Sequence, residues 1–483
     1  MCRHWRRTFI ERADLWSKLF LSNGEVYTKT FLERAKGAAL DTFVRDEVSL
    51  ATMEMLSSHT EQIKYLNFVQ SRWANIQNFS KLNPGPLPLL RTLGIGISSG
   101  DNLDGFDRTP PSPPLFNNAV NLESLVLHSD AQLTPFLTHF AFPNLVAFNL
   151  SANPSEGFRA SLLLDFLEAS PTLQAVDVTI IATMSLERVP QQRVVVLPNV
   201  KIFGLTVNDG GPGYRVATHI SCPSARTTLL SHRITIFNID GVPEEVFPAS
   251  VPWSAIVHQY SSSPVKRVSL VIKSLPVITC ILTFRSLDAT VIELRFKVAM
   301  TDYEDEDEDE DEGGWDPASE ELFNGVFTQA IRTIRNHPQL PRVRHLSLFH
   351  GFVYVASPSQ VLHMASEMEQ LFKSLGPLHK VILNWDLRQY FHPFLDSPDG
   401  HVGDPVVFPQ TKRLTVCHPV ELSDEECTMA IVGLARSQHA LGIPFERVLI
   451  LGKGMPAGME EGLKPWVRSV EYRYGKPYGT DDE

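Results

Sequence analysis

The chain contains residue types that can bind metals, bind nucleotides or act as catalysts, but they lack the spacing that such sites need. Cys417 and His418 lie near Cys427, but a tetrahedral zinc site takes four ligands, and no Cys-x-x-Cys or His-Glu-x-x-His pair completes the set. The glycines of 94–100 lack dinucleotide-loop spacing, and Gly452-Lys-Gly lacks the Ser or Thr of a phosphate loop. The histidines are scattered, and no serine elbow is present. We therefore expect no enzyme activity, no catalytic residue, no metal site and no cofactor.

The strongest charge feature is the unbroken acidic run from Glu304 to Glu312. Removing its nine charges from the formal net charge of −12 leaves −3, so the rest of the chain is close to neutral. Adjacent carboxylates repel one another, which predicts a disordered acidic loop at about 301–316. A solvated spacer is the expected role, with a lure for a basic partner or a divalent-ion sponge as alternatives. Nucleic-acid binding calls for a basic face, and the overall charge does not favour one, so we expect no nucleic-acid partner.

Composition places the chain inside the cell. Its five cysteines are few, odd in number and scattered, which disfavours a disulfide framework and favours a reducing compartment. No apolar run approaches the ~20 residues of a membrane span, and arginines and acids interrupt the N-terminus where a secretory signal would be apolar. We expect a cytoplasmic or nuclear protein that does not contact a membrane.

A short phrase recurs along the chain: a proline, any residue, an apolar residue, two of any kind, an apolar residue, any residue and a last apolar residue. Pro143 to Leu150 and Pro341 to Leu348 are two copies. The first position of each apolar triplet, its anchor, is apolar in every copy except the one at Thr411. The anchors are Ile63, Leu90, Leu122, Leu145, Leu173, Val200, Ile234, Val265, Val291, Val343, Leu378, Thr411, Phe445 and Val467. Proline precedes ten of these anchors by one or two positions, where random placement would give roughly two. The phrase therefore marks a repeated strand.

Helical patterns lie between copies of the phrase. One apolar stripe runs from Phe323 to Ile334, another from Val361 to Leu375, and a third from Cys427 to Ala435. Alternating helix and strand at roughly 30-residue spacing predicts parallel strands side by side with helices outside. We expect an α/β solenoid over 23–483, with parallel strands lining a concave face and the acidic loop interrupting it. Six side chains should then be buried, namely Leu145, Phe148, Leu150, Val343, Leu346 and Leu348.

The repeat resembles a leucine-rich-repeat horseshoe. In that family an Asn three residues beyond the last apolar position ties one coil to the next, and here only Asn153 and Asn208 fall there. The unit lengths also vary, so we expect an irregular, leucine-rich-repeat-like solenoid.

The first twenty residues carry a second resemblance. A Cys-x-x-Trp helix, a short break and a Leu-Trp pair are similar to the second half of an F-box, as found in fungal F-box proteins with degenerate leucine-rich repeats. Residues 31–43 resemble the helix and first strand that follow the box in those proteins. The resemblance makes 1–22 a partial F-box with a second short helix after Asp14, and its adaptor-side residues are Cys2, Trp5, Leu15, Trp16 and Leu19. The alternative is that these residues only cap the open end of the solenoid.

Two functions follow from these resemblances. The first is an F-box-type substrate receptor of a Skp–cullin ubiquitin ligase, with a Skp-type adaptor and an unknown protein target as partners. The second is a stand-alone leucine-rich-repeat scaffold unrelated to ubiquitin transfer. The first half of an F-box has no counterpart in the sequence, so we expect the chain as given to bind the adaptor weakly or not at all.

The partner-binding face is expected in the C-terminal third. The residue after the third apolar position of each copy should lie on or beside the concave side. In the later copies this rule, with the neighbouring position, selects Phe349, Asn384, Trp385, Cys417 and Arg473. Aromatic residues and arginine at a surface are frequent anchors of protein interfaces. The alternative is that these side chains fill gaps between irregular coils.

Overall fold

The computed structural model is a mixed α/β protein that divides into two compact units, Met1–Ala225 and Arg226–Glu483. The structure describes residues 10–97 (without 72, 83 and 84), 116, 119–129, 137, 142–152, 158–181, 184–185, 189–208 (without 191), 212–236, 260, 263–273, 277–300, 325–350 (without 326, 329 and 339), 358–384, 411–417, 424–452 and 455–474. The predicted acidic loop lies outside these residues. In neither unit do the described strands close into a barrel.

In the first unit, the described strands form a parallel sheet in which each strand pairs with the next one along the chain. They are β1 (Lys18–Phe20), β2 (Leu40–Asp46), β3 (Ile63–Ser71), β4 (Thr92–Ile97), β5 (Ser124–Ser129), β6 (Ala147–Ala152), β8 (Ala175–Ile180) and β11 (Ile202–Asn208). Two short parallel pairs lie apart from this sheet, β7 (Phe158–Arg159) with β9 (Met184–Ser185) and β10 (Val195–Val196) with β12 (Ile220–Ser221).

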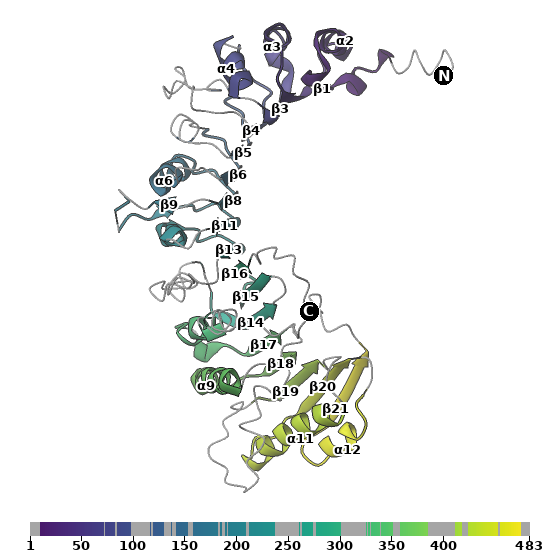
Figure 1. Ribbon diagram of the computed structural model, residues 1–483, viewed down its shortest axis with the longest axis vertical. Coiled ribbons are helices and arrows are strands. Elements are labelled where there is room, and N and C mark those ends of the chain that lie inside the picture. The colour runs from purple at the N-terminus through teal and green to yellow at the C-terminus, as the bar shows by residue number, and fades with distance from the viewer. Residues whose placement is uncertain are drawn as a thin grey trace, which may run out of the picture. The chain divides into compact units, whose positions relative to one another are not determined.

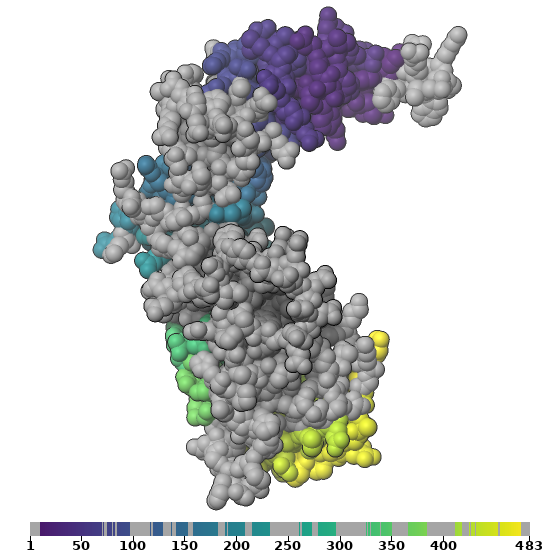
Figure 2. Space-filling model, in the orientation of Figure 1, coloured from purple at the N-terminus to yellow at the C-terminus, as the bar shows by residue number. Residues whose placement is uncertain are grey.

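Helices occupy several of the connections between these strands. The α-helices are α2 (Glu25–Ala35), α3 (Leu50–Ser57), α4 (Trp73–Lys81) and α6 (Ala160–Glu168), and the 3₁₀ turns are η1 (Ala13–Trp16), η2 (Leu21–Asn23), η3 (Thr60–Gln62) and η5 (Pro212–His219). Ser49 caps α3 by accepting a hydrogen bond from the Thr52 backbone N–H at 3.2 Å. In Figure 1, α2, α3 and α4 lie on one side of their strands. Figure 2 shows the same N-terminal residues (purple) as a closely packed body.

Polar side chains tie successive coils of the first unit together. The Asn144 side-chain amide donates to the Val120 carbonyl at 2.9 Å, and the Asn199 amide donates to the Pro171 carbonyl at 3.0 Å. Asn121 and Thr172 make the same kind of bond, to the carbonyls of Pro88 and Pro143. Each donor directly precedes an anchor of the repeated phrase, and each acceptor lies one coil earlier. These bonds satisfy turn carbonyls that no strand ladder reaches.

The second unit has a mixed sheet. Its strands are β13 (Thr227–Ile236), β14 (Val265–Lys273), β15 (Val277–Ser286), β16 (Val291–Met300), β17 (His345–His350), β18 (Lys380–Asn384), β19 (Arg413–Cys417), β20 (Arg447–Gly452) and β21 (Ser469–Tyr474). Six of these strands lie side by side in the order β14, β17, β18, β19, β20 and β21, and each neighbouring pair is parallel. β15 is antiparallel to both β14 and β16, and β16 pairs in parallel with β13.

The prediction of only parallel strands separated by helices is therefore wrong at 265–300. The copies anchored at Val265 and Val291 have no helix between them, because the chain turns back and forms β15 instead. Only residues 274–276 separate β14 from β15, and so short a connection permits an antiparallel pair but not a parallel one.

Most of the remaining copies agree with the predicted pattern of burial. In the copy at Val467 the three apolar residues are only half-buried, and the copy at Ile234 extends beyond the described residues. The six side chains that were predicted to be buried are each at most 2% exposed, namely Leu145, Phe148, Leu150, Val343, Leu346 and Leu348. The second unit's helices include α9 (Pro358–Ser374), α11 (Asp424–Ala440), α12 (Met459–Leu463), a helix that contains 330–335, and the turn η7 (Leu340–Arg342). Their buried residues fall on the predicted stripes and include Phe327, Ile331, Met368, Phe372, Ile431 and Leu434.

Candidate functional site

Each sheet has one face against its helices and a second face that we call the open face. Strand residues alternate between buried positions and half-buried or exposed positions, as β6, β8 and β20 show over their whole length. The half-buried and exposed positions form the open face. β19 departs from this alternation, because every residue after Arg413 is buried. Two groups of side chains stand out on the open face, one in each unit.

The first group is an aromatic row formed by Phe20 of β1, Phe43 of β2 and Tyr65 of β3. The rings of Phe20 and Phe43 are stacked, with centroids 4.9 Å apart and planes at 13°. Tyr65 lies beyond them, with its ring centroid 5.2 Å from that of Phe43. Phe20 is 44% exposed, and the other two rings are half-buried. Three adjacent strands thus present a continuous aromatic surface.

Polar side chains beyond the aromatic row lie flat against the sheet because glycines make room for them. The Tyr65 hydroxyl accepts a hydrogen bond from the Asn67 side-chain amide at 2.8 Å. Asn67 in turn covers Gly94 of β4, where an added Cβ would lie 2.5 Å from its Oδ1. Asp177 covers Gly204 of β11 in the same way, with Oδ1 2.6 Å from the position of a Cβ. Gly94 therefore leaves room for the Asn67 amide that bonds to the Tyr65 hydroxyl.

The second group is a basic row on the open face of the second unit. Adjacent strands bring together, in direct register, Arg285 of β15, Arg267 of β14, His345 of β17, Lys380 of β18, Arg413 of β19 and Arg447 of β20. Side chains in register on neighbouring strands point to the same face, so the six basic groups form one line.

A hollow opens beside the basic row, with a volume of about 560 Å³. Its lining residues are all basic, namely Lys266, Arg344, His345, His379, Lys380 and Arg413. The rings of His345 and His379 lie 6.0 Å apart and nearly parallel, at 28°. The hollow is at the amino-terminal ends of β14, β17, β18 and β19, where each strand begins.

Burial and neighbouring positive charges lower the pKa values of three groups in the basic row. Burial, followed by the charges of Lys266 and other neighbours, lowers the pKa of His345 to about 4. The pKa of Lys380 is lowered by burial and then by the surrounding arginines, of which Arg267 has the largest effect. Burial also lowers the pKa of Arg267, and its register partner Arg285 adds to this effect. His345 is therefore neutral at pH 7.

Carboxylates neutralise only the far end of the basic row. Arg447 is paired with Glu471 of β21. Beside the row, Lys412 is paired with Glu446 at 3.2 Å. Among the described residues, Arg285, Arg267, Lys380 and Arg413 have no carboxylate within ion-pair distance.

The predicted partner-binding residues fall on a different row of the same sheet. Phe349 of β17 is in register with Asn384 of β18, and Cys417 of β19 is in register with Leu451, which pairs with Arg473. Phe349 is half-buried and Arg473 is exposed, 3.9 Å from Glu471. Cys417 is 1% exposed, so the expectation that it lies on an accessible face is wrong. Trp385 lies outside the described residues.

The N-terminal segment forms part of the first sheet. Cys2 and Trp5 lie outside the described residues. Trp16 ends η1, is buried, and packs edge-on against Phe31 at 4.8 Å. Leu19 is fully buried in strand β1, so the expected second helix that included it is wrong. Leu15 is 45% exposed.

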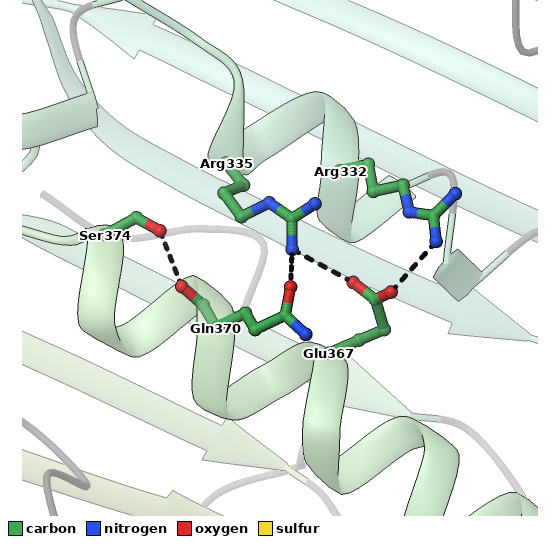
Figure 3. Close-up of polar contacts among 5 residues, drawn as sticks. All are labelled: Arg332, Arg335, Glu367, Gln370 and Ser374. Carbon is green, nitrogen blue, oxygen red and sulfur yellow. Dashed lines mark hydrogen bonds and ion pairs between the residues drawn. The ribbon is translucent and has the colours of Figure 1, made fainter.

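The buried carboxylate of Glu367 joins two helices. Arg332 and Arg335, from the helix that contains 330–335, contact its oxygens at 3.2 and 3.4 Å, as Figure 3 shows. Arg335 also donates to the side chain of Gln370, on the same helix as Glu367. Each of the five residues drawn there has a polar partner within the cluster, which indicates a structural contact between helices.

The described cysteine thiols are buried and form no disulfide bond. Burial raises the pKa of the Cys222 thiol to about 12 and that of Cys417 to about 11, and it raises the pKa of Cys280 further. Such thiols remain protonated and unreactive near neutral pH.

Within the described ranges, no three His, Cys, Asp or Glu side chains gather closely enough to share a metal ion. No helix in the described part of the chain has the length and apolar character of a membrane span.

No protein-family model matches the sequence, and no curated protein is significantly similar to it.

Proposed function

We propose that the chain is a protein-interaction scaffold, built as an irregular leucine-rich-repeat-like solenoid, that binds a protein through the open face of its sheets. The aromatic row of Phe20, Phe43 and Tyr65 is the observation that carries this proposal. Leaving large rings partly exposed forgoes the free energy of their burial, about 25 cal/mol per Å² of apolar surface. Aromatic side chains are also over-represented among the residues that dominate the binding energy of interfaces.

The packing around the aromatic row supports a binding role. Phe43 contacts both of its neighbours, and the bond from Asn67 to the Tyr65 hydroxyl fixes the outer ring. A partner that covers these rings would lose little side-chain entropy in ordering them, because they are already held in position.

The test compares partner capture by the wild-type chain with capture by a Phe20→Ala/Phe43→Ala variant. Each protein is tagged and used for affinity capture from cells, and captured proteins are quantified by mass spectrometry. A Val26→Ala/Leu50→Ala variant is the matched control, since Val26 is 83% exposed and Leu50 52% exposed, both on helices. We expect the aromatic variant to lose at least one partner that the control retains. Equal capture by the two folded variants would refute the role of the aromatic row.

We propose a substrate receptor of a Skp–cullin ubiquitin ligase as the more specific form of this function. The support for this proposal is the order of elements. A short turn ends at Trp16, where the F-box resemblance expects the end of the box, and α2 and β2 follow, where it expects a helix and a strand. Leu15 is exposed beside buried Trp16 and is available for an adaptor contact.

Co-expression with a Skp-type adaptor tests the receptor proposal. Adaptor binding that Leu15→Asp abolishes, without loss of folding, would support it. Because the chain as given is expected to bind the adaptor weakly or not at all, the same test is repeated with the first half of an F-box joined ahead of residue 1. If the adaptor does not co-purify with that extended chain either, the stand-alone scaffold is the better description, and the N-terminal turn then only closes the end of the core.

A further inference from the structure

We propose that the basic row of the second unit binds an extended acidic segment of a partner protein. This inference rests on the proposed function as a protein-interaction scaffold. It adds a second contact surface, in a different unit from the aromatic row, and it specifies the chemistry of the partner.

The dimensions of the basic row suit an extended polypeptide. It crosses six adjacent strands, and strands are about 4.8 Å apart, so it is about 24 Å long. An extended chain advances about 3.3 Å per residue, so a segment of about seven residues spans the row. The hollow of about 560 Å³ beside its central part gives acidic side chains access to Lys266, Arg344 and His379 as well.

The basic row is an arrangement that an anionic partner would stabilise. Like charges directly opposite one another on adjacent strands are destabilising. Lys380 and Arg413 are such a pair, as are Arg267 and Arg285, and none of the four has a carboxylate partner among the described residues. Carboxylates placed over the row would replace this repulsion by attraction and would make charge-assisted hydrogen bonds to the arginines.

The surroundings of the basic row favour a polypeptide over a nucleic acid. Two residues further along the strands, the positions are uncharged, so the cationic strip is narrow on that side. Ser269, Ile382 and Leu449 are half-buried there, whereas Ser347 and Thr415 are buried. Single-stranded nucleic acids are bound on exposed aromatic rings that stack with bases, and no Phe, Tyr or Trp lines the hollow among the described residues. An acidic segment with apolar side chains would match both the strip and its uncharged border.

Fluorescence anisotropy with a defined probe tests the proposal. The probe is a labelled peptide of about ten residues that alternates glutamate and leucine, slightly longer than the row. The full chain is titrated into it at low salt. A single-stranded oligonucleotide and a peptide with lysine in place of glutamate are compared in parallel. We expect the acidic peptide to bind most tightly, and its affinity to fall as added salt shortens the Debye length.

Charge reversal assigns the binding to the basic row. Lys380→Glu/Arg413→Glu should weaken binding at least about tenfold, because it replaces attraction by repulsion at the centre of the row. Lys373→Glu/Arg436→Glu is the control, since it changes the net charge equally at exposed positions of α9 and α11. Lys380→Met/Arg413→Met provides a second test should the reversed variant fold poorly.

Three results would overturn the inference: no binding of the acidic peptide, equal weakening by the control, or tighter binding of the oligonucleotide. The proposed function would survive any of them if the Phe20→Ala/Phe43→Ala variant still loses a partner. Conversely, peptide binding at the basic row would stand even if the aromatic row proved inert.

Discussion

Replacing Lys380 by methionine is expected to make the protein more stable. Lys380 lies between His345 and Arg413 on the adjacent strands, and burial and neighbouring cations lower its pKa. Methionine keeps a long apolar side chain for packing and removes only the charge. No described carboxylate loses a partner in this substitution.

The magnitude follows from the spacing of the strands. Arg413 is one strand away, at about 4.8 Å, where two unit charges in bulk water repel by about 0.9 kcal/mol. Measured like-charge pairs across strands agree with this scale, at roughly 0.2–1 kcal/mol. Arg267 and Arg447 are two strands away, close to the Debye length of about 8–10 Å, and add only about 0.1–0.2 kcal/mol each. His345 is neutral at pH 7 and contributes nothing. We expect a gain of about 1 kcal/mol in the free energy of unfolding.

Urea denaturation at pH 7 measures this gain. With a slope near 3 kcal/mol per M, the midpoint of Lys380→Met should rise by about 0.3 M at low salt. In about 1 M NaCl the Debye length is about 3 Å, and the gain should nearly vanish. Lys373→Met is the control of opposite sign, because it removes an ion pair with Glu369 at 2.5 Å and should lower stability by about 0.3–0.5 kcal/mol. A Lys380→Met protein that is less stable, or whose gain is insensitive to salt, would refute the account of the basic row.

Three further predictions concern the same unit. The folded-state pKa of His345, about 4, lies below its ordinary value of 6.5, so the unfolded chain binds the proton more readily. Stability therefore falls as the pH drops from about 6.5 to about 4. His345→Gln should make this fall smaller, as measured by urea midpoints across the same pH range. Gly376→Ala should destabilise by about 2 kcal/mol or more in thermal unfolding, because its Cβ would collide with the Pro341 carbonyl oxygen, a backbone atom that cannot move aside cheaply. Glu367→Gln should cost about 1–3 kcal/mol by leaving two arginines without their buried carboxylate. Glu369→Gln, at a half-buried position, should cost less than about 0.5 kcal/mol, and equal losses in urea denaturation would contradict this difference.

The sequence predicts the strands well because their burial is periodic. Leu145, Phe148 and Leu150 follow the proline-marked phrase, and each is buried as the phrase requires. Strand direction is a different matter. Val277–Ser286 alternates like its neighbours, and periodicity does not indicate which way a strand runs. The three-residue connection at 274–276 was the available signal for an antiparallel turn.

The basic row could also have been found by aligning copies of the phrase. In four of the later copies both residues after the anchor are basic, as in Lys266-Arg267 after Val265 and His379-Lys380 after Leu378. In an early copy the same positions are Val146-Ala147. The overall net charge conceals this difference, because the acidic residues lie elsewhere. The aromatic row has no comparable signal, because Phe20 precedes the first recognisable copy.

The antiparallel strand β15 has a consequence for how the second unit folds. In a stack where every strand pairs with its predecessor, structure can spread from one coil to the next. Here β16 pairs with β13, and both β14 and β15 come between them in the chain. Joining β13 to β16 therefore closes a long loop that contains a hairpin, at an entropic cost that a neighbour-to-neighbour pairing avoids. These four strands should form and unfold as one cooperative block, whereas β20 and β21 at the other end of the sheet can open on their own.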